Sequence, residues 1–279
     1  RREDVEGSTC VRLRTAVRDQ GTHRLRVVEG ASGRQTTTNP IVCGGGTGFL
    51  WGMIHGHTEM SDGTGSLEQY FHQLRHEVGL DFAAPGDHDH RWETSDAFWS
   101  VTQEAVKRWH EEGRFVTFLG YEWAKWRRNG DGDRNVYYLA DDRPMYRSDD
   151  GEYPSPPDLF GALGRNRERA IVIPHHTGHG GNFCDWKDHD GAYERLVEIF
   201  QVRGSYECSE ADGNPVPEHT PGVPPYERGY VRDALALGWR VGFTGGGDDH
   251  AGLWGSEGPG GHGYKQGLMC VEAAERSRD

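Results

Sequence analysis

From Phe49 onward, short apolar runs alternate with segments of helical periodicity, and this alternation restricts the possible folds more than any other feature of the sequence. Strands that alternate with helices along the chain are typical of βαβ units, whose strands lie parallel in one sheet. We therefore predict an α/β fold built as a parallel β/α barrel. The predicted strands cover residues 49–54, 80–84, 115–119, 136–139, 171–173, 196–200, 240–243 and 268–271.

Helix start and stop signals lie between these strands. Ser66 and Gln69 form a capping box that predicts a helix to about Val78, closed by Gly79. Further helices are predicted over residues 95–112, from Pro156, and over residues 226–237.

The first part of the chain has a different pattern. Residues 11–14 and 25–28 alternate apolar and basic side chains, which predicts two half-buried strands around a turn. The glycine-rich segment 43–48 is interpreted as a hinge. We expect an N-terminal β segment and linker over residues 1–48 and the main domain over residues 49–279.

Composition excludes several classes of protein. The chain has 44 acidic and 31 basic residues and a net charge of −13, which disfavours binding to a nucleic-acid backbone. No apolar stretch is long enough to cross a membrane. The five cysteines are an odd number without a CxxC pair, so we expect neither a disulfide framework nor a thiolate zinc site, and we expect a reducing, cytoplasmic location. The chain begins without Met and without a signal-peptide pattern, so we expect that upstream sequence is missing.

Histidines and carboxylates follow successive predicted strands. The carboxyl ends of the strands form the catalytic face of a β/α barrel, so we expect these side chains to meet at one rim. Each motif alone has an ordinary explanation as polar loop residues, but their joint placement favours a metal site. The residues are His55, His57, Asp87, His88, Asp89, Glu122, His175, His176, Asp248 and His250.

Imidazole and carboxylate ligands suit Zn, Mn or Fe. These residues exceed what one ion needs, so the sequence predicts two or three divalent metal ions in one cluster. Adjacent ions can share a carboxylate and activate water near neutral pH.

The motifs resemble those of the polymerase-and-histidinol-phosphatase (PHP) superfamily of metallohydrolases. The segment 55–63 is similar to its opening motif and the segment 79–89 to its second, while Glu122, His175 and the Asp248-Asp249-His250 segment match later positions. Within the superfamily, the chain resembles a subgroup in which an upstream β segment ends in Asn-Pro-Ile, here Asn39-Pro40-Ile41.

The resemblance implies a distorted (β/α)7 barrel, PHP-like or TIM-like, with a short N-terminal β extension. It also implies three ligand sets: His55, His57, Glu122 and Asp248; Glu122 with His175 and Asn135; and Asp62, His88 and His250. Asn135 stands where many PHP enzymes have a histidine, so the second ion is expected to bind more loosely, or to be completed by His176, His179 or water. Asp87 is expected to orient a ligand histidine.

The resemblance and the multinuclear site together favour phosphoester hydrolysis of a small anionic, phosphorylated substrate. Two alternatives stay open: hydrolysis of a non-phosphate ester, amide or cyclic substrate, and a non-catalytic, metal-stabilised binding module. A replicative exonuclease is disfavoured by the acidic charge. His176 or His179 is a candidate proton donor to the leaving group. Candidate cations for the substrate anion are Arg91, Lys125, Arg134 and Arg203.

Overall fold

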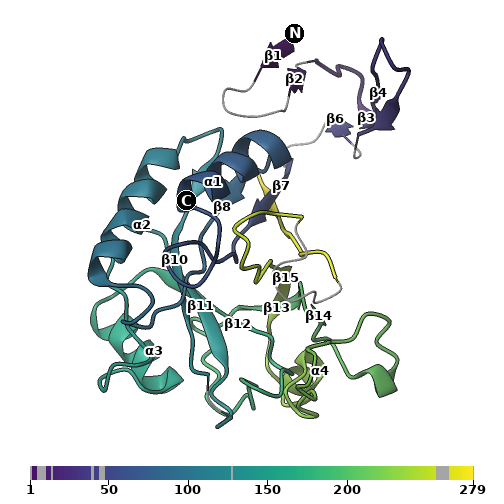
Figure 1. The fold of residues 1–279 in the computed structure, drawn as a ribbon. Helices are drawn as coiled ribbons and strands as arrows, with labels where there is room; N and C mark the ends of the chain where they lie inside the picture. Colours follow the sequence, from purple (N-terminus) through teal and green to yellow (C-terminus); the bar gives the residue numbers. More distant parts are fainter. Residues whose placement is uncertain are drawn as a thin grey trace. The chain divides into compact units, whose positions relative to one another are not determined.

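The structure of the protein is a computed structural model that describes residues 2–4, 11–13, 15–38, 41–43, 48–126, 128–255 and 264–278. The chain divides into two compact units (Figure 1). The first comprises Arg1–Leu50 with Val271–Glu275, and the second comprises Trp51–Cys270 with Arg276–Asp279. The short C-terminal segment of the first unit was not part of the division expected from the sequence.

The first unit is built from short antiparallel strand pairs. The pairs are β1 (Arg2–Asp4) with β2 (Val11–Leu13), β3 (Gly21–His23) with β6 (Ile41–Cys43), and β4 (Arg26–Val28) with β5 (Gln35–Thr37). The predicted pairing of residues 11–14 with 25–28 is therefore wrong, because each of these strands pairs with a closer neighbour in the chain. Leu13 and Val28 are also 57% and 52% exposed rather than half-buried. Of the predicted hinge, residues 44–47 lie outside the described residues.

The second unit contains the parallel part of the fold. β8 (Phe82–Ala83) pairs in parallel with β7 (Gly48–Met53) on one side and with β9 (Val116–Thr117) on the other. The edge strand beyond β7 is β16 (Met269–Ala273). Helices connect these parallel strands, as crossover connections require.

The connecting helices begin at the predicted caps. The Ser66 side chain accepts a hydrogen bond from the Gln69 backbone N–H at the start of α1 (Leu67–His72), which continues as a π-helical segment, η1 (Gln73–Val78). Gly79 ends this segment with φ 80°, a left-handed conformation that favours glycine. Ser95 caps α2 (Asp96–Trp109) in the same way. Sequence prediction of both helices is confirmed.

A second sheet is antiparallel, contrary to the parallel arrangement predicted from the sequence. Its order is β10 (Leu119–Trp123), β11 (Asp133–Tyr138) and β12 (Ala170–His175). The loop between β10 and β11 contains no helix among its described residues, so the chain turns back beside the strand that it has just left. The predicted helix α3 (Pro156–Arg165) is present between β11 and β12.

A third sheet has β13 (Leu196–Gln201) at its centre, parallel to β15 (Gly242–Gly245) and antiparallel to β14 (Gly204–Ser205). Between β14 and β15 lie a short 3-10 helix, η2 (Glu210–Asp212), and α4 (Val231–Ala236), which begins later than predicted. The described strands thus form a mixed α/β structure with several sheets rather than one closed barrel.

Isolated bridges connect the ends of these sheets. His88 forms a parallel bridge with Glu122, and Gly56 forms one with Asp249. Both bridges lie beside the predicted ligand motifs, so the site is located where the sheets approach one another.

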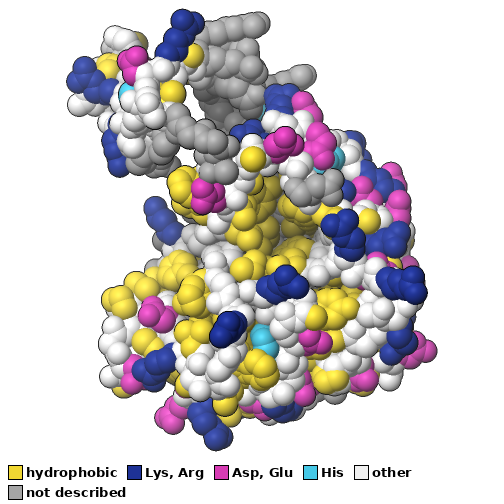
Figure 2. Space-filling view, turned by 180° about the vertical axis from the view of Figure 1, so that it is seen from behind, with side chains coloured by type: hydrophobic (Ala, Val, Ile, Leu, Met, Phe, Trp, Pro, Cys, Tyr) yellow, Lys and Arg dark blue, Asp and Glu magenta, His cyan; other side chains and the backbone are white. Residues whose placement is uncertain are grey.

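The main hydrophobic core contains α1, α2, α3 and the strands that they cover, with buried aromatic rings such as Phe71, Tyr121 and Tyr138. On the face shown in Figure 2, acidic and basic side chains are interspersed. Among the described residues, no helix is both long enough and apolar enough to cross a membrane.

Candidate metal centre

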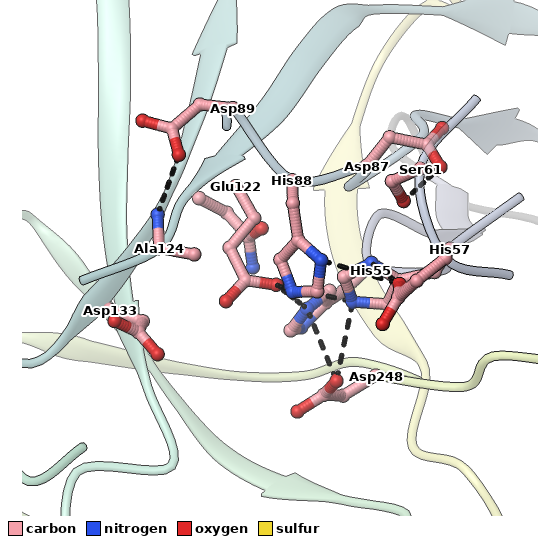
Figure 3. A network of polar contacts seen from close by, with 12 residues as sticks. His55, His57, Ser61, Asp87, His88, Asp89, Glu122, Ala124, Asp133 and Asp248 are labelled. Atoms are coloured by element: carbon pink, nitrogen blue, oxygen red, sulfur yellow. Dashed lines mark hydrogen bonds and ion pairs between the residues drawn. The ribbon is translucent and has the colours of Figure 1, made fainter. Parts of the chain in front are cut away.

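The predicted ligand residues meet in three adjoining groups, and within each group the potential ligand atoms lie within 4.8 Å of one another. Figure 3 shows several of these side chains converging from separate strands. His57 belongs to two groups, and so does Glu122. The groups are His55, His57, Glu122 and Asp248; Glu122, Asp133, His175 and His176; and His57, Asp62, His88 and His250.

The first group joins the end of β7 to the loop after β15. Nε2 of His57 lies 3.1 Å from Oε2 of Glu122 and 3.3 Å from Oδ1 of Asp248. Nε2 of His55 lies 3.4 Å from the same glutamate oxygen. All four side chains are buried. These four residues are the set that the family resemblance implied for the first ion.

Glu122 joins the first group to the second. Its Oε2 faces the two histidines after β7, whereas its Oε1 lies 3.1 Å from Nε2 of His175. We expected Glu122 and His175 to follow their strands, but both lie inside them, in β10 and β12. Burial would raise the pKa of Glu122, but the adjacent His175 and His88 hold it well below its ordinary range.

Asp133 in the second group was missed by the sequence analysis. It precedes Asn135 by two residues on β11, so both side chains project from the same face of the strand. Its Oδ2 lies 3.5 Å from Nε2 of His176. Asn135 places its amide 3.3 Å from Nδ1 of His175, next to the group. The available signal was the two-residue periodicity of a strand beginning with an aspartate.

The third group is the most exposed. Oδ1 of Asp62 lies 3.3 Å from Nδ1 of His88 and 3.4 Å from Nε2 of His250, and the Asp62 side chain is 39% exposed. Glu93, another residue missed from the sequence, also approaches Nδ1 of His88, at 3.3 Å.

Buried polar atoms without hydrogen bonds indicate that the site fits metal ions. Among the described residues, these atoms include both ring nitrogens of His57 and Nδ1 of His176. Leaving such atoms unpaired in a protein interior is costly. Carboxylate oxygens lie within 3.3 Å of His57 Nε2 without the geometry of a hydrogen bond. A cation between them would satisfy both the imidazole and the carboxylates.

Charges around the first group are strongly coupled. Burial would lower the pKa of His55, but Glu198 and Asp248 raise it well above the ordinary value. Burial would likewise raise the pKa of Asp248, but Arg203 and His55 hold it well below the ordinary value. Each of these charges therefore favours the ionised form of its neighbour.

A set of polar side chains surrounds the ligand groups. Oε2 of Glu198 lies 2.9 Å from Nδ1 of His55, and Nε2 of Gln201 donates to Oδ2 of Asp248 at 2.5 Å. Arg203, which is partly buried, forms an ion pair with the same aspartate oxygen. Glu198 and Gln201 were not identified from the sequence, although a glutamate in the apolar run of β13 signals a buried charge with a specific partner.

Asp87 acts on a loop. Its carboxylate accepts hydrogen bonds from the Thr58 backbone N–H at 2.7 Å, from Thr58 Oγ1 at 2.9 Å and from Ser61 Oγ at 2.7 Å. Asp87 therefore fixes the segment between His57 and Asp62, as Figure 3 shows for Ser61.

Three of the four predicted anion-binding cations are engaged elsewhere. Arg134 is buried and donates to Glu194 at 2.6 Å. Lys125 donates to the carbonyl oxygen of Pro154, and Arg91 lies 3.2 Å from Asp150. The guanidinium of Arg203, in contrast, forms an ion pair with Asp248 of the ligand groups.

Two residues of the groups have unusual backbone conformations. His176 has φ 31° and Asp248 has φ 51°, in the left-handed region that side chains rarely adopt. Such conformations persist where surrounding structure enforces them, and they concentrate at functional sites.

The sequence that forms this site matches a known protein family. A family model described as "Protein of unknown function (DUF3604)" matches residues 51–214. The chain belongs to this family. The DUF3604 match includes the ligand residues from His55 to His176 and ends before Asp248 and His250.

Curated relatives come from chlamydiae. An "Uncharacterized protein" of Chlamydia muridarum is 27% identical over 265 residues, which cover 94% of this chain and 42% of the relative. One of Chlamydia pneumoniae is 25% identical over 239 residues, which cover 85% of this chain and 38% of the relative. The chain thus spans less than half the length of these relatives.

A solved structure shares the fold. It is the crystal structure of "a two-domain protein containing predicted PHP-like metal-dependent phosphoesterase" from Bacteroides vulgatus. The TM-score is 0.53 at 16% sequence identity, and the similarity covers 94% of this chain and 64% of that one. At this identity, the similarity establishes a common fold.

Proposed function

We propose that this protein is a metal-dependent phosphoesterase that binds three divalent cations in one cluster. The observation that carries the proposal is the union of the three ligand groups through His57 and Glu122. A buried carboxylate with one oxygen toward each of two groups is suited to bridging two cations. The shared fold with a protein containing a predicted PHP-like phosphoesterase supports the same reaction class.

The residues divide among the cations as follows. His55, His57, Glu122 and Asp248 hold the first; Glu122, Asp133, His175 and His176 hold the second; Asp62, His88 and His250 hold the third. His57 is assigned to the first because its Nε2 is nearer to the carboxylates there than its Nδ1 is to Asp62, at 3.9 Å. Mn, Zn and Fe all suit these imidazole and carboxylate ligands.

Asn135 and His176 receive roles different from those expected. We assign Asn135 to orienting His175, since its amide lies against Nδ1 of that ring while Nε2 faces Glu122. His176 becomes a ligand rather than a proton donor, since it faces Asp133 and its pKa is lowered well below the ordinary value by burial and by His175. A neutral imidazole is the form that binds metal.

Divalent cations supply the Lewis acidity that activates water and neutralises the charge of a phosphate group. Two contacts orient residues of the first group. Glu198 lies within hydrogen-bond distance of His55, and Gln201 donates a hydrogen bond to Asp248. Arg203 forms an ion pair with Asp248 of the first group. It is our candidate for contact with a substrate phosphate oxygen. These fixed groups leave little reorganisation for the reaction itself.

We also infer that the sheets are parts of the distorted seven-stranded barrel implied by the family resemblance. The parallel bridges of His88 with Glu122 and of Gly56 with Asp249 connect strand ends of different sheets at the ligand groups. In this arrangement, the metal cluster occupies the rim where catalytic residues of barrels lie.

The proposal is tested by elemental analysis of the protein, followed by activity assays against phosphomonoesters, phosphodiesters and carboxylic esters. We expect at least two metal equivalents per chain and turnover of a phosphoester that is lost in Asp248→Asn. Glu59→Gln is the matched control, because Glu59 is an exposed carboxylate near His57. Full metal content without phosphoester turnover would refute the proposed activity, and turnover of carboxylic esters alone would favour the other hydrolase class.

A further inference from the structure

Two exposed tryptophans lie beside the third ligand group. Trp92 is 69% exposed and Trp126 is 44% exposed. Their rings form an edge-to-face pair with centroids 5.6 Å apart, and the Trp126 ring lies 5.0 Å from the ring of His88. Single exposed apolar residues are common on proteins, but adjoining aromatic rings next to a reactive site are typical of a ligand-binding surface.

A buried histidine supports both indole rings. The ring of His90 stacks on Trp92 with an interplanar angle of 11° and lies 4.6 Å from the ring of Trp126. His90 is held in turn by Glu93, whose Oε2 lies 3.0 Å from its Nδ1 and 3.3 Å from Nδ1 of His88. One carboxylate thus fixes both the support of the tryptophans and a predicted metal ligand.

The backbone of Trp126 indicates that its position is specific. Its φ of 44° is in the left-handed region, which a bulky side chain adopts only when surrounding structure enforces it. A position of Trp126 that is set before a ligand arrives lowers the entropic cost of binding.

We propose that Trp92 and Trp126 form a stacking platform for the leaving group of the substrate, and that this leaving group carries a planar aromatic ring, either a nucleobase or an aryl group. The inference rests on the proposed phosphoesterase function. The platform adjoins His88, so a ring stacked there stands next to a phosphate held at the cluster. A planar aromatic ring can stack on the indoles through its π face, which an aliphatic alcohol does not have.

Direct binding tests the platform without requiring catalysis. Adenosine and phenol are titrated into the metal-loaded protein, and binding is followed by indole fluorescence and calorimetry. We expect at least one probe to bind, with affinity reduced roughly 10-fold or more in Trp92→Leu and in Trp126→Leu. The Phe variants should retain most of the affinity, because they keep an aromatic face.

Trp51→Leu is the matched control, since Trp51 is 47% exposed on β7 and lies outside the platform. The affinity of this variant for adenosine and phenol should equal that of the wild type. Kinetics with AMP, phenyl phosphate and ribose 5-phosphate distinguish the sources of the ring. If the natural leaving group carries a nucleobase, the Leu variants should have a raised KM for AMP. If it carries an aryl group, the Leu variants should have a raised KM for phenyl phosphate. Ribose 5-phosphate should be unaffected.

Failure of the platform and failure of the proposed function have different signatures. If the Leu variants bind both probes as the wild type does, or if neither probe binds, the platform is refuted, while phosphoester turnover can still be present. If the probes bind in a tryptophan-dependent way but no phosphoester is hydrolysed, the proposed function is refuted and the stacking surface stands.

Discussion

Glu122 and His175 meet across an intervening strand, with Oε1 of the glutamate 3.1 Å from Nε2 of the histidine. Glu122 is on β10 and His175 on β12, and β11 lies between them. In the register, Asn135 is opposite Glu122 and Asp133 is opposite His175. The antiparallel sheet therefore brings three members of the second ligand group together, with the orienting amide beside them, and His176 joins the group from the residue after β12.

Glu122→Gln should release at least one metal ion and reduce activity by about 100-fold or more, because a neutral amide cannot bridge two cations as a carboxylate does. Metal content and turnover are measured together, with Glu59→Gln as the control. Wild-type turnover with full metal content in Glu122→Gln would contradict the bridging role.

Asp133→Asn should weaken binding of the second ion, because it removes a charged ligand. Asn135→Leu should weaken the same ion by about 10- to 100-fold, the usual effect of losing an orienting contact on a ligand histidine. Chelator titration with metal-sensitive detection measures both. If Asn135→Leu and the wild type lose metal at the same chelator concentrations, Asn135 has a structural role only. If Asp133→Asn weakens binding of an ion other than the second, the assignment of Asp133 as its ligand is wrong.

Asp87→Ala should lower the free energy of unfolding by about 2–4 kcal/mol, because two buried hydrogen bonds and one partly buried hydrogen bond lose their acceptor. The third ion should also be lost first, since Asp62 is carried by the same loop. Ser61→Ala removes one of the three bonds and should have a smaller effect on both quantities. Denaturant unfolding and metal analysis provide the comparison, and equal effects of the two substitutions would argue against this role of Asp87.

Stability should depend on pH in opposite directions with and without metal. Burial would lower the pKa of His88, but Glu122 and Asp62 raise it well above the ordinary value. The pKa of His55 is likewise raised by the carboxylates around it. A raised histidine pKa stabilises the metal-free protein fully below the unfolded pKa of about 6.5, and this stability is lost as pH rises through the folded pKa. Metal binding displaces these protons, so affinity rises with pH.

The difference in Tm between metal-loaded and chelator-treated protein should therefore widen as pH rises from about 6 to about 9. Scanning calorimetry at several pH values measures it. A difference that is constant or narrows with pH would show that the histidines of the cluster do not exchange protons for metal.

The sequence by itself determined the features that depend on local chemistry. Ser66 and Ser95 begin helices because their side chains satisfy backbone N–H groups only a few residues away. The motifs around His55, His88 and Asp248 lie near strand ends, and their residue types predict metal ligands in any fold that brings them together. Local sequence patterns therefore identified most of the candidate cluster.

Tertiary structure alone decided which partners these residues have. Local periodicity does not specify whether neighbouring strands run parallel or antiparallel, so the reversal of β11 and the placement of Asp133 in the second group could not be predicted. His55 and Glu198 are 143 residues apart in sequence and 2.9 Å apart in the fold. A contact of this kind depends on the packing of whole sheets, because burial in a shared interior makes two distant charges stabilise each other.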